Sequence, residues 1–343
     1  ESVAQLLVDL LDRNLYERSC DVRWWATDSA VVEAAKSPGA ESLRFSDRLK
    51  ALPSGAAPPE ATVIIKRAGG RPPVTLAFEV QDGIITGSLD DGEKPPAGFT
   101  ARRHDWNPAL QTVLSGEHTA YFKPDPAFAE DPASPQGSGH IAGTLSAKGL
   151  IAWTGRLGDG QTLTCSTPHL LGGRLAFHAL VAKKSGSAQG WLILDDTNAG
   201  LSGTPEHRRA GLPTLMLGAH GGRYTPVSHL FNFLSAPAGD GNAEAVFAEN
   251  NVTELFRQPL TLQAPSTLRV FGDNPNRLSL QVNARRGTFT GSFTLPGSPA
   301  RRAAITGAFV RLPGADPGQG HGYYLLPGPD GLISGGAHLI VPD

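Results

Sequence analysis

The sequence is poor in cysteine, in net charge and in long apolar runs. Two cysteines among 343 residues exclude a small disulfide-rich scaffold. A formal net charge of -2 removes any general argument for nucleic acid or an anionic membrane surface as a partner. No run of 18 apolar residues occurs, so no transmembrane helix is expected.

Short motifs of common catalytic and metal sites are also missing. None of the patterns HExxH, HxH, CxxC or GxSxG occurs, and the ten histidines are scattered. Ser138 and His140 stand in a glycine-rich segment, where a turn is expected and not a nucleophile held beside its base. The glycines between 318 and 322 precede a strand pattern, whereas a phosphate-binding loop opens a helix. We therefore expect no enzyme activity and no cofactor.

Glycine and proline are abundant, and they indicate a turn-rich chain. Together they account for 41 + 28 = 69 of the 343 residues, which excludes a helical bundle or a coiled coil. A hydrophobic content of 40% argues against disorder. The sequence starts at Glu1 and its only methionine is Met216, so we expect a processed product or a fragment, with any export signal already removed.

The first 59 residues read differently from the rest. Ser2 is a suitable N-cap for a helix whose apolar residues follow helical spacing, among them Leu6 and Leu10. Residues 53–59 are rich in Pro, Gly and Ala and are typical of a linker. The pattern predicts a short helical N-terminal segment with a linker over residues 1–59.

From residue 61 onward the apolar residues follow a period of two, which predicts strands. A hairpin is expected at Gln81-Asp82-Gly83, and five short antiparallel strands are expected between residues 141 and 194. Within that meander, Leu150, Trp153 and Leu157 do not share one parity, so a bulge or twist is expected in their strand. Strands also fill the last eighty residues, whereas residues 213–263 are the least legible part.

A self-similar pair of segments supports two related β-units. LAFEV at 76–80 followed by GIITGSL at 83–89 matches LSLQV at 278–282 followed by GTFTGSF at 287–293. We predict an all-β protein of two related antiparallel barrel-like or sandwich-like units, at 60–204 and 205–343, with a single merged barrel as the alternative. The Thr-Gly-Ser elements at 86–88 and 290–292 are expected to occupy equivalent positions in their hairpins.

Two groups of residues are candidates for binding. Asp195, Asp196 and Asn198 cluster oxygen ligands as calcium loops do, although they lack the downstream glutamate of an EF-hand and also fit an ordinary turn. Trp24 and Trp25 are adjacent and cannot face the same side of one element, so one is expected to be exposed or to pack against another subunit. Trp153 and Trp191 lie in apolar strands and are expected in the core. Acidic residues in polar turns do not identify a glycosidase pair.

Six glycine- and aromatic-rich phrases occur along the chain: GEHTAYF at 116–122, PQGSGH at 135–140, GLIAWTGRLGD at 149–159, GWL at 190–192, GTFTGSF at 287–293 and GHGYYLL at 320–326. Through these phrases, residues 62–341 or so resemble a C-terminal β-rich module of large secreted or surface bacterial repeat proteins. The resemblance implies export and an extracellular or surface setting in bacteria, with no catalytic residues to transfer.

On these grounds we expect a non-enzymatic structural or adhesive module that contacts other protein subunits or copies of itself. A glycan-binding or polysaccharide-acting module is one alternative, and an accessory subunit of a membrane-associated complex is another. Cys165 shares a strand face with Leu163 and is expected to be an inert core thiol. In an oxidising compartment, however, Cys165 and Cys20 could pair and tie the helical segment to the first β-unit.

Overall fold

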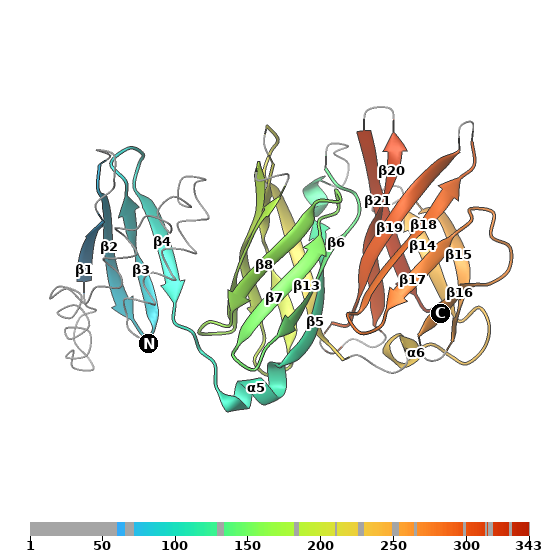
Figure 1. Ribbon diagram of the computed structural model, residues 1–343, viewed down its shortest axis with the longest axis horizontal. Helices are drawn as coiled ribbons and strands as arrows, with labels where there is room; N and C mark the ends of the chain where they lie inside the picture. Colours follow the sequence, from blue (N-terminus) through green and yellow to red (C-terminus); the bar gives the residue numbers. More distant parts are fainter. Residues whose placement is uncertain are drawn as a thin grey trace. The chain divides into compact units, whose positions relative to one another are not determined.

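The computed structural model has a mostly β architecture (Figure 1). The residues it describes are 60–65, 72–128, 134–181, 185–209, 211–225, 230–248, 254–263, 266–297, 300–312, 314, 318–328 and 331–342. The boundary between two compact units falls between His104 and Asp105. The all-β class with antiparallel barrel-like units is confirmed, whereas the helical segment predicted for residues 1–59 lies outside the described residues.

The unit before this boundary contains a four-stranded antiparallel sheet in the order β1-β2-β3-β4. Its strands are β1 (Glu60–Ile65), β2 (Val74–Gln81), β3 (Ile84–Asp90) and β4 (Ala97–Arg102). The predicted hairpin is present, because Asp82 and Gly83 have φ of 51° and 79° and form the two-residue turn between β2 and β3. Positive φ at both positions is what a type I′ turn requires.

The second unit begins with a sheet that we call the middle barrel. Its strands are β5 (Gly116–Pro124), β6 (Gly139–Leu145), β7 (Leu150–Arg156), β8 (Thr162–Pro168), β9 (Arg174–Val181), β10 (Gly186–Leu194), β11 (Gly200–Gly203), β12 (Glu206–Arg208) and β13 (Leu215–Tyr224). β11 and β12 both pair with β10 and β13, and β13 pairs with β5. Because β8 and β9 also contact each other, the sheet curls into a barrel-like ring.

The remaining strands form the C-terminal barrel. They are β14 (Ala243–Ala248), β15 (Glu254–Gln263), β16 (Thr267–Val270), β17 (Ser279–Asn283), β18 (Thr288–Leu295), β19 (Arg301–Val310), β20 (Gln319–Gly328) and β21 (Gly331–Ile340). The order is β16-β15-β14-β21-β20-β19-β18-β17, and contacts between β16 and β17 bring its two ends together. First and last strands pair here, as they do in the middle barrel.

Side chains fill the inside of both barrels. Trp153, Phe122 and Phe177 are buried in the middle barrel, and Phe247 and Phe293 are buried in the C-terminal barrel. Inward positions alternate along strands such as β9, as the pleat requires. Helices are short: α5 (Pro108–Leu114), η1 (Pro126–Phe128) and α6 (Leu230–Phe233). No helix in the described part of the chain is long and apolar enough to cross a membrane.

The sheets divide the chain at places other than residue 204. β12 and β13 follow that residue and belong to the middle barrel, while β1–β4 form a sheet of their own. The described strands therefore form three separate sheets.

The two Thr-Gly-Ser elements pair alike in their sheets. Thr86 lies opposite Glu79 and Ser88 opposite Ala77, while Thr290 lies opposite Gln281 and Ser292 opposite Ser279. The central glycines, Gly87 and Gly291, each lie in the second strand of their hairpin. The register matches the expectation for equivalent positions, and the existence of an internal repeat stays a prediction.

The prediction of a bulge or twist in β7 is wrong. β7 pairs with β6 and β8 in unbroken register, and Ile151 and Trp153 are fully buried. Leu150 instead faces outward with 41% of its surface exposed. Leu157 shares the parity of Trp153 and is buried just beyond the strand end. The apparent parity conflict came from counting Leu150 as a core residue.

Candidate functional site

The two barrels of the second unit contact each other through elements that are distant in sequence. We call this contact, made by β5, β6 and the β7–β8 turn with β19–β21, the barrel junction. The Thr119 hydroxyl donates to the Phe309 carbonyl at 2.7 Å in a fully buried position. The Ser334 hydroxyl donates to the Gly158 carbonyl at 2.6 Å and accepts from the Gly137 amide at 3.3 Å. One buried and two partly buried hydrogen bonds therefore connect the two barrels.

Glycines allow the two backbones to approach closely at the barrel junction. A Cβ on Gly137 would overlap the Cβ of Tyr323 and the carbonyl of Gly335. The next amide, that of Ser138, donates to the Gly322 carbonyl at 3.2 Å. Part of the sequence PQGSGH thus lies at the contact between the two barrels, where the backbone of Ser138 bonds the C-terminal barrel.

The glycines between 318 and 322 allow a similar close approach inside the C-terminal barrel. A Cβ on Gly318 would overlap the ring of Phe233, and one on Gly322 would overlap the Thr306 carbonyl. Gly318 precedes β20, so the expected strand entry with close packing is confirmed.

Aromatic and histidine rings line part of the barrel junction in what we call the histidine column. The Tyr121 ring of β5 stacks on the His321 ring of β20, with centroids 4.1 Å apart. The His220 ring of β13 lies 5.5 Å from Tyr121 on the same column. The His338 ring of β21 meets His321 edge-on at 5.4 Å. Four strands from two barrels therefore supply this group.

The electrostatics of the column keep its inner histidines neutral. Burial, followed by the nearby His338, Lys123 and His220, lowers the pKa of His321 to about 3. Burial and Lys123 also lower the pKa of His338. A buried imidazole in a positive environment resists protonation, so the column carries no charge on these two rings at neutral pH.

A second set of polar side chains lies beside the β7–β8 turn. His140 is buried against Tyr323, with ring centroids 6.4 Å apart, and burial lowers its pKa to about 4. Burial raises the pKa of Tyr323 to about 12. His207 is also buried, and its Nε2 lies 3.9 Å from Oδ2 of Asp159. That distance is longer than a hydrogen bond. Asp159 therefore does not orient His207 as the partner of a general base would.

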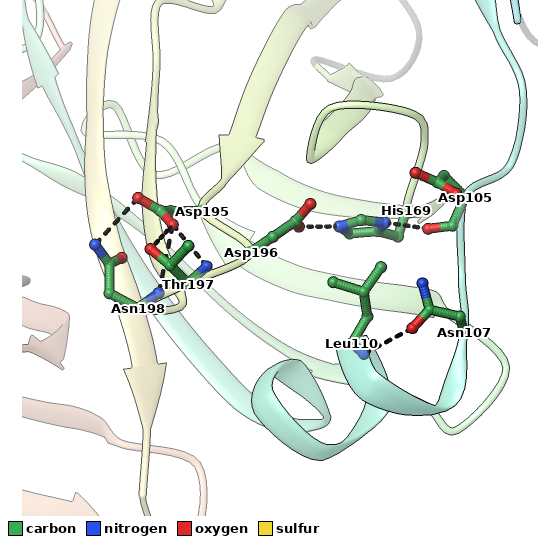
Figure 2. A network of polar contacts seen from close by, with 8 residues as sticks. All are labelled: Asp105, Asn107, Leu110, His169, Asp195, Asp196, Thr197 and Asn198. Atoms are coloured by element: carbon green, nitrogen blue, oxygen red, sulfur yellow. Dashed lines mark hydrogen bonds and ion pairs between the residues drawn. The ribbon is translucent and has the colours of Figure 1, made fainter.

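The calcium candidates do not converge on one point. Both carboxylate oxygens of Asp195 accept hydrogen bonds within the turn, from Thr197 and from Asn198 (Figure 2). Asp196 points away and bonds His169 instead, at 2.8 Å. The Asn198 side-chain oxygen accepts from the Gly200 amide. These contacts are those of an Asx-type turn, in which the side-chain oxygens satisfy backbone donors.

His169 anchors the segment that precedes the middle barrel. Its ring bonds Asp196 through Nε2 and the Asp105 carbonyl through Nδ1 at 2.7 Å (Figure 2). The Asn107 side chain accepts from the amides of Ala109 and Leu110 and so caps α5. The fully buried His169 thus holds the chain where it enters the second unit, a structural role that sequence analysis did not assign.

The remaining predicted residues have mixed outcomes. Trp153 is fully buried, whereas Trp191 is only half-buried because Leu192 takes the inward position of β10. Cys165 is half-buried and packs against the core of the middle barrel, and burial raises the pKa of its thiol to about 12. Cys20, Trp24 and Trp25 lie outside the described residues, so the Cys20–Cys165 disulfide stays a prediction.

A hollow of about 470 Å³ lies on the outer face of the C-terminal barrel. Its lining comes from β17, β18 and β19 and consists of Ser279, Gln281, Thr290, Gly291, Ser292, Arg302, Ala303 and Ala304. Arg302 donates from Nη2 to the Ser292 hydroxyl at 3.0 Å. The lining is thus polar, uncharged apart from one arginine, and built on three adjacent strands.

Comparison with known proteins gives no family for this chain. No protein-family model matches it, and no curated protein sequence matches it. Within the part of the chain that the structure describes, no group of three or more His, Cys, Asp or Glu side chains is placed to hold a metal ion.

Proposed function

We propose that this chain is a non-enzymatic structural or adhesive module of an extracellular or surface assembly in bacteria. The observation that supports it most is the barrel junction, where buried hydrogen bonds and close glycine contacts connect two barrels filled by side chains. Two packed barrels joined in this way make a stiff spacer. Other protein subunits or further copies of the chain are its proposed partners.

The chemistry of the buried histidines also favours a structural role. Burial lowers the pKa values of His118 and His140 to about 4. A general base works best with a pKa near the operating pH and with access to its substrate. Neutral, buried imidazoles that pack against rings contribute to the core instead.

Two experiments test the two parts of this proposal. Mild protease treatment of intact cells of the source organism should degrade the protein. If the protease degrades it only after the cells are lysed, the surface location is overturned. Replacing residues 105–343 in the gene by a flexible Gly/Ser linker of similar length should abolish assembly or adhesion. Full assembly and adhesion with the linker would overturn the structural role.

A glycan-binding module is the second candidate, and the hollow on β17–β19 favours it. Its hydroxyl, amide and guanidinium groups are suited to sugar hydroxyls. An accessory role in a membrane-associated complex stays a further proposal, to be tested by pull-down from native membranes.

A further inference from the structure

We propose that the hollow on β17–β19 binds an acidic saccharide, a sugar chain that carries carboxylate or sulfate groups. This inference gives the glycan-binding candidate a place and a ligand class. It does not depend on the structural role of the two barrels, because the hollow lies on the outer face of one of them.

The strand register sets out the polar groups in rows across the hollow. Ser279 on β17 lies opposite Ser292 on β18, which lies opposite Ala304 on β19. Gln281 lies opposite Thr290 in the next row. The small side chains of the first row create the hollow, and hydroxyl and amide groups line its border. The volume of about 470 Å³ is in the range of ligand pockets, about 300–1,000 Å³.

The donors and acceptors of the lining match a sugar better than they match a nucleobase. Serine and threonine hydroxyls and the glutamine amide both donate and accept, as sugar hydroxyls do. No aromatic side chain lines the hollow, so it offers no stacking platform for nucleobases.

Arg302 accounts for the acidic part of the ligand. It is exposed, and one of its N–H groups donates to Ser292, which orients the guanidinium toward the lining. The other donors of its planar fork match a carboxylate or a sulfate ester. No acidic residue lines the hollow to compete for the arginine.

The hairpin β2–β3 shows how a small change alters this chemistry. Glu79 occupies the register position that corresponds to Gln281, and it accepts a hydrogen bond from Thr86 at 3.0 Å. A carboxylate at that place repels an anionic sugar. The β17–β19 face therefore differs from the β2–β3 face in favouring an acidic ligand.

Calorimetric titration of the full chain tests the inference with matched probes. The probes are a galacturonic acid trisaccharide, a sulfated trisaccharide, a neutral trisaccharide and free sodium sulfate. Saturable binding of one or both acidic saccharides is expected, at least tenfold tighter than the neutral sugar and weakened by salt. Binding of the uronide alone or of the sulfated sugar alone identifies which acidic group the site takes.

Variants identify the site. R302A is expected to weaken acidic-saccharide binding by tenfold or more, and R302K by less, because lysine keeps the charge but loses the fork. R301A is the matched control, since Arg301 is exposed on the same strand but does not line the hollow, and its affinity should stay within twofold of the wild type. Circular dichroism verifies that each variant is folded.

Four results would overturn the inference: no saturable binding of either acidic sugar, equal binding of the neutral sugar, unchanged affinity of R302A, or sulfate binding as tight as the sugars. None of these results affects the structural role, which is tested by protease treatment and linker replacement.

Discussion

Protonation of the histidine column should weaken the fold in acid, and His321 is the residue on which this is best measured. In the unfolded chain a histidine has a pKa of about 6.5, whereas burial and then the nearby His338, Lys123 and His220 lower the pKa of folded His321 to about 3. Above pH 6.5 both states are neutral and no effect exists. As the pH falls below 6.5 the unfolded chain takes up a proton that the folded chain refuses, so stability decreases until about pH 3.

The size of this effect follows from the linkage relation. A full proton difference changes the free energy of unfolding by about 1.4 kcal/mol per pH unit, and at pH 6.5 the unfolded histidine is half protonated, so His321 removes about 2 kcal/mol between pH 6.5 and pH 4.5. In His321→Gln that contribution disappears, and the loss of stability between these pH values should shrink by about 2 kcal/mol. The variant is expected to be less stable at pH 7, because the ring stacked on Tyr121 is gone.

Urea unfolding followed by circular dichroism at both pH values measures the difference. The same substitution at the exposed His104 controls for the loss of a histidine as such. The reasoning is refuted if His321→Gln and the wild type lose the same free energy of unfolding between pH 6.5 and pH 4.5. An NMR titration in which folded His321 gains its proton near pH 6.5 would refute it as well.

Other consequences of the packing can be measured on single variants. Gly137→Ala should lower the free energy of unfolding by about 1–3 kcal/mol because its Cβ has no room, whereas Gly98→Ala, with only one atom near, should change it little; equal effects would contradict the junction packing. Thr119→Val should cost about 1–3 kcal/mol in urea unfolding, since the Phe309 carbonyl loses its buried donor, and a neutral result would contradict that bond. At pH 8 the Cys165 thiol should resist alkylation until the protein unfolds, as mass spectrometry of its peptide can show, and rapid labelling of the folded chain would contradict its burial.

Strand periodicity predicted most of the architecture, and its failures have local causes. The five-strand meander corresponds to β6–β10, and the last eighty residues contain β17–β21 as expected. β13 was missed because its inward positions include Ala219 and Gly221, which conceal the apolar period. α5 was missed too, although Asn107 followed by Pro108 is a signal for a capped helix start.

The candidate sites were less predictable because they depend on contacts between distant parts of the chain. Thr119 and Phe309 are 190 residues apart in sequence, and the histidine column draws on four strands. Local reading did recognise the turn alternative for Asp195 and Asn198, whose bonds are all short-range. It could not place Asp196 against His169, since that bond needs the folded barrel.

The two barrels pack against each other through the barrel junction, and hydrogen exchange at the junction tests this packing most directly. The amides of Gly137 and Ser138 donate across the junction, to the Ser334 hydroxyl and the Gly322 carbonyl. If the barrels stay packed, both amides exchange as slowly as the ladder amides of β6. Exchange as fast as in the exposed segment 238–240 would mean that the barrels separate readily, and it would contradict this packing.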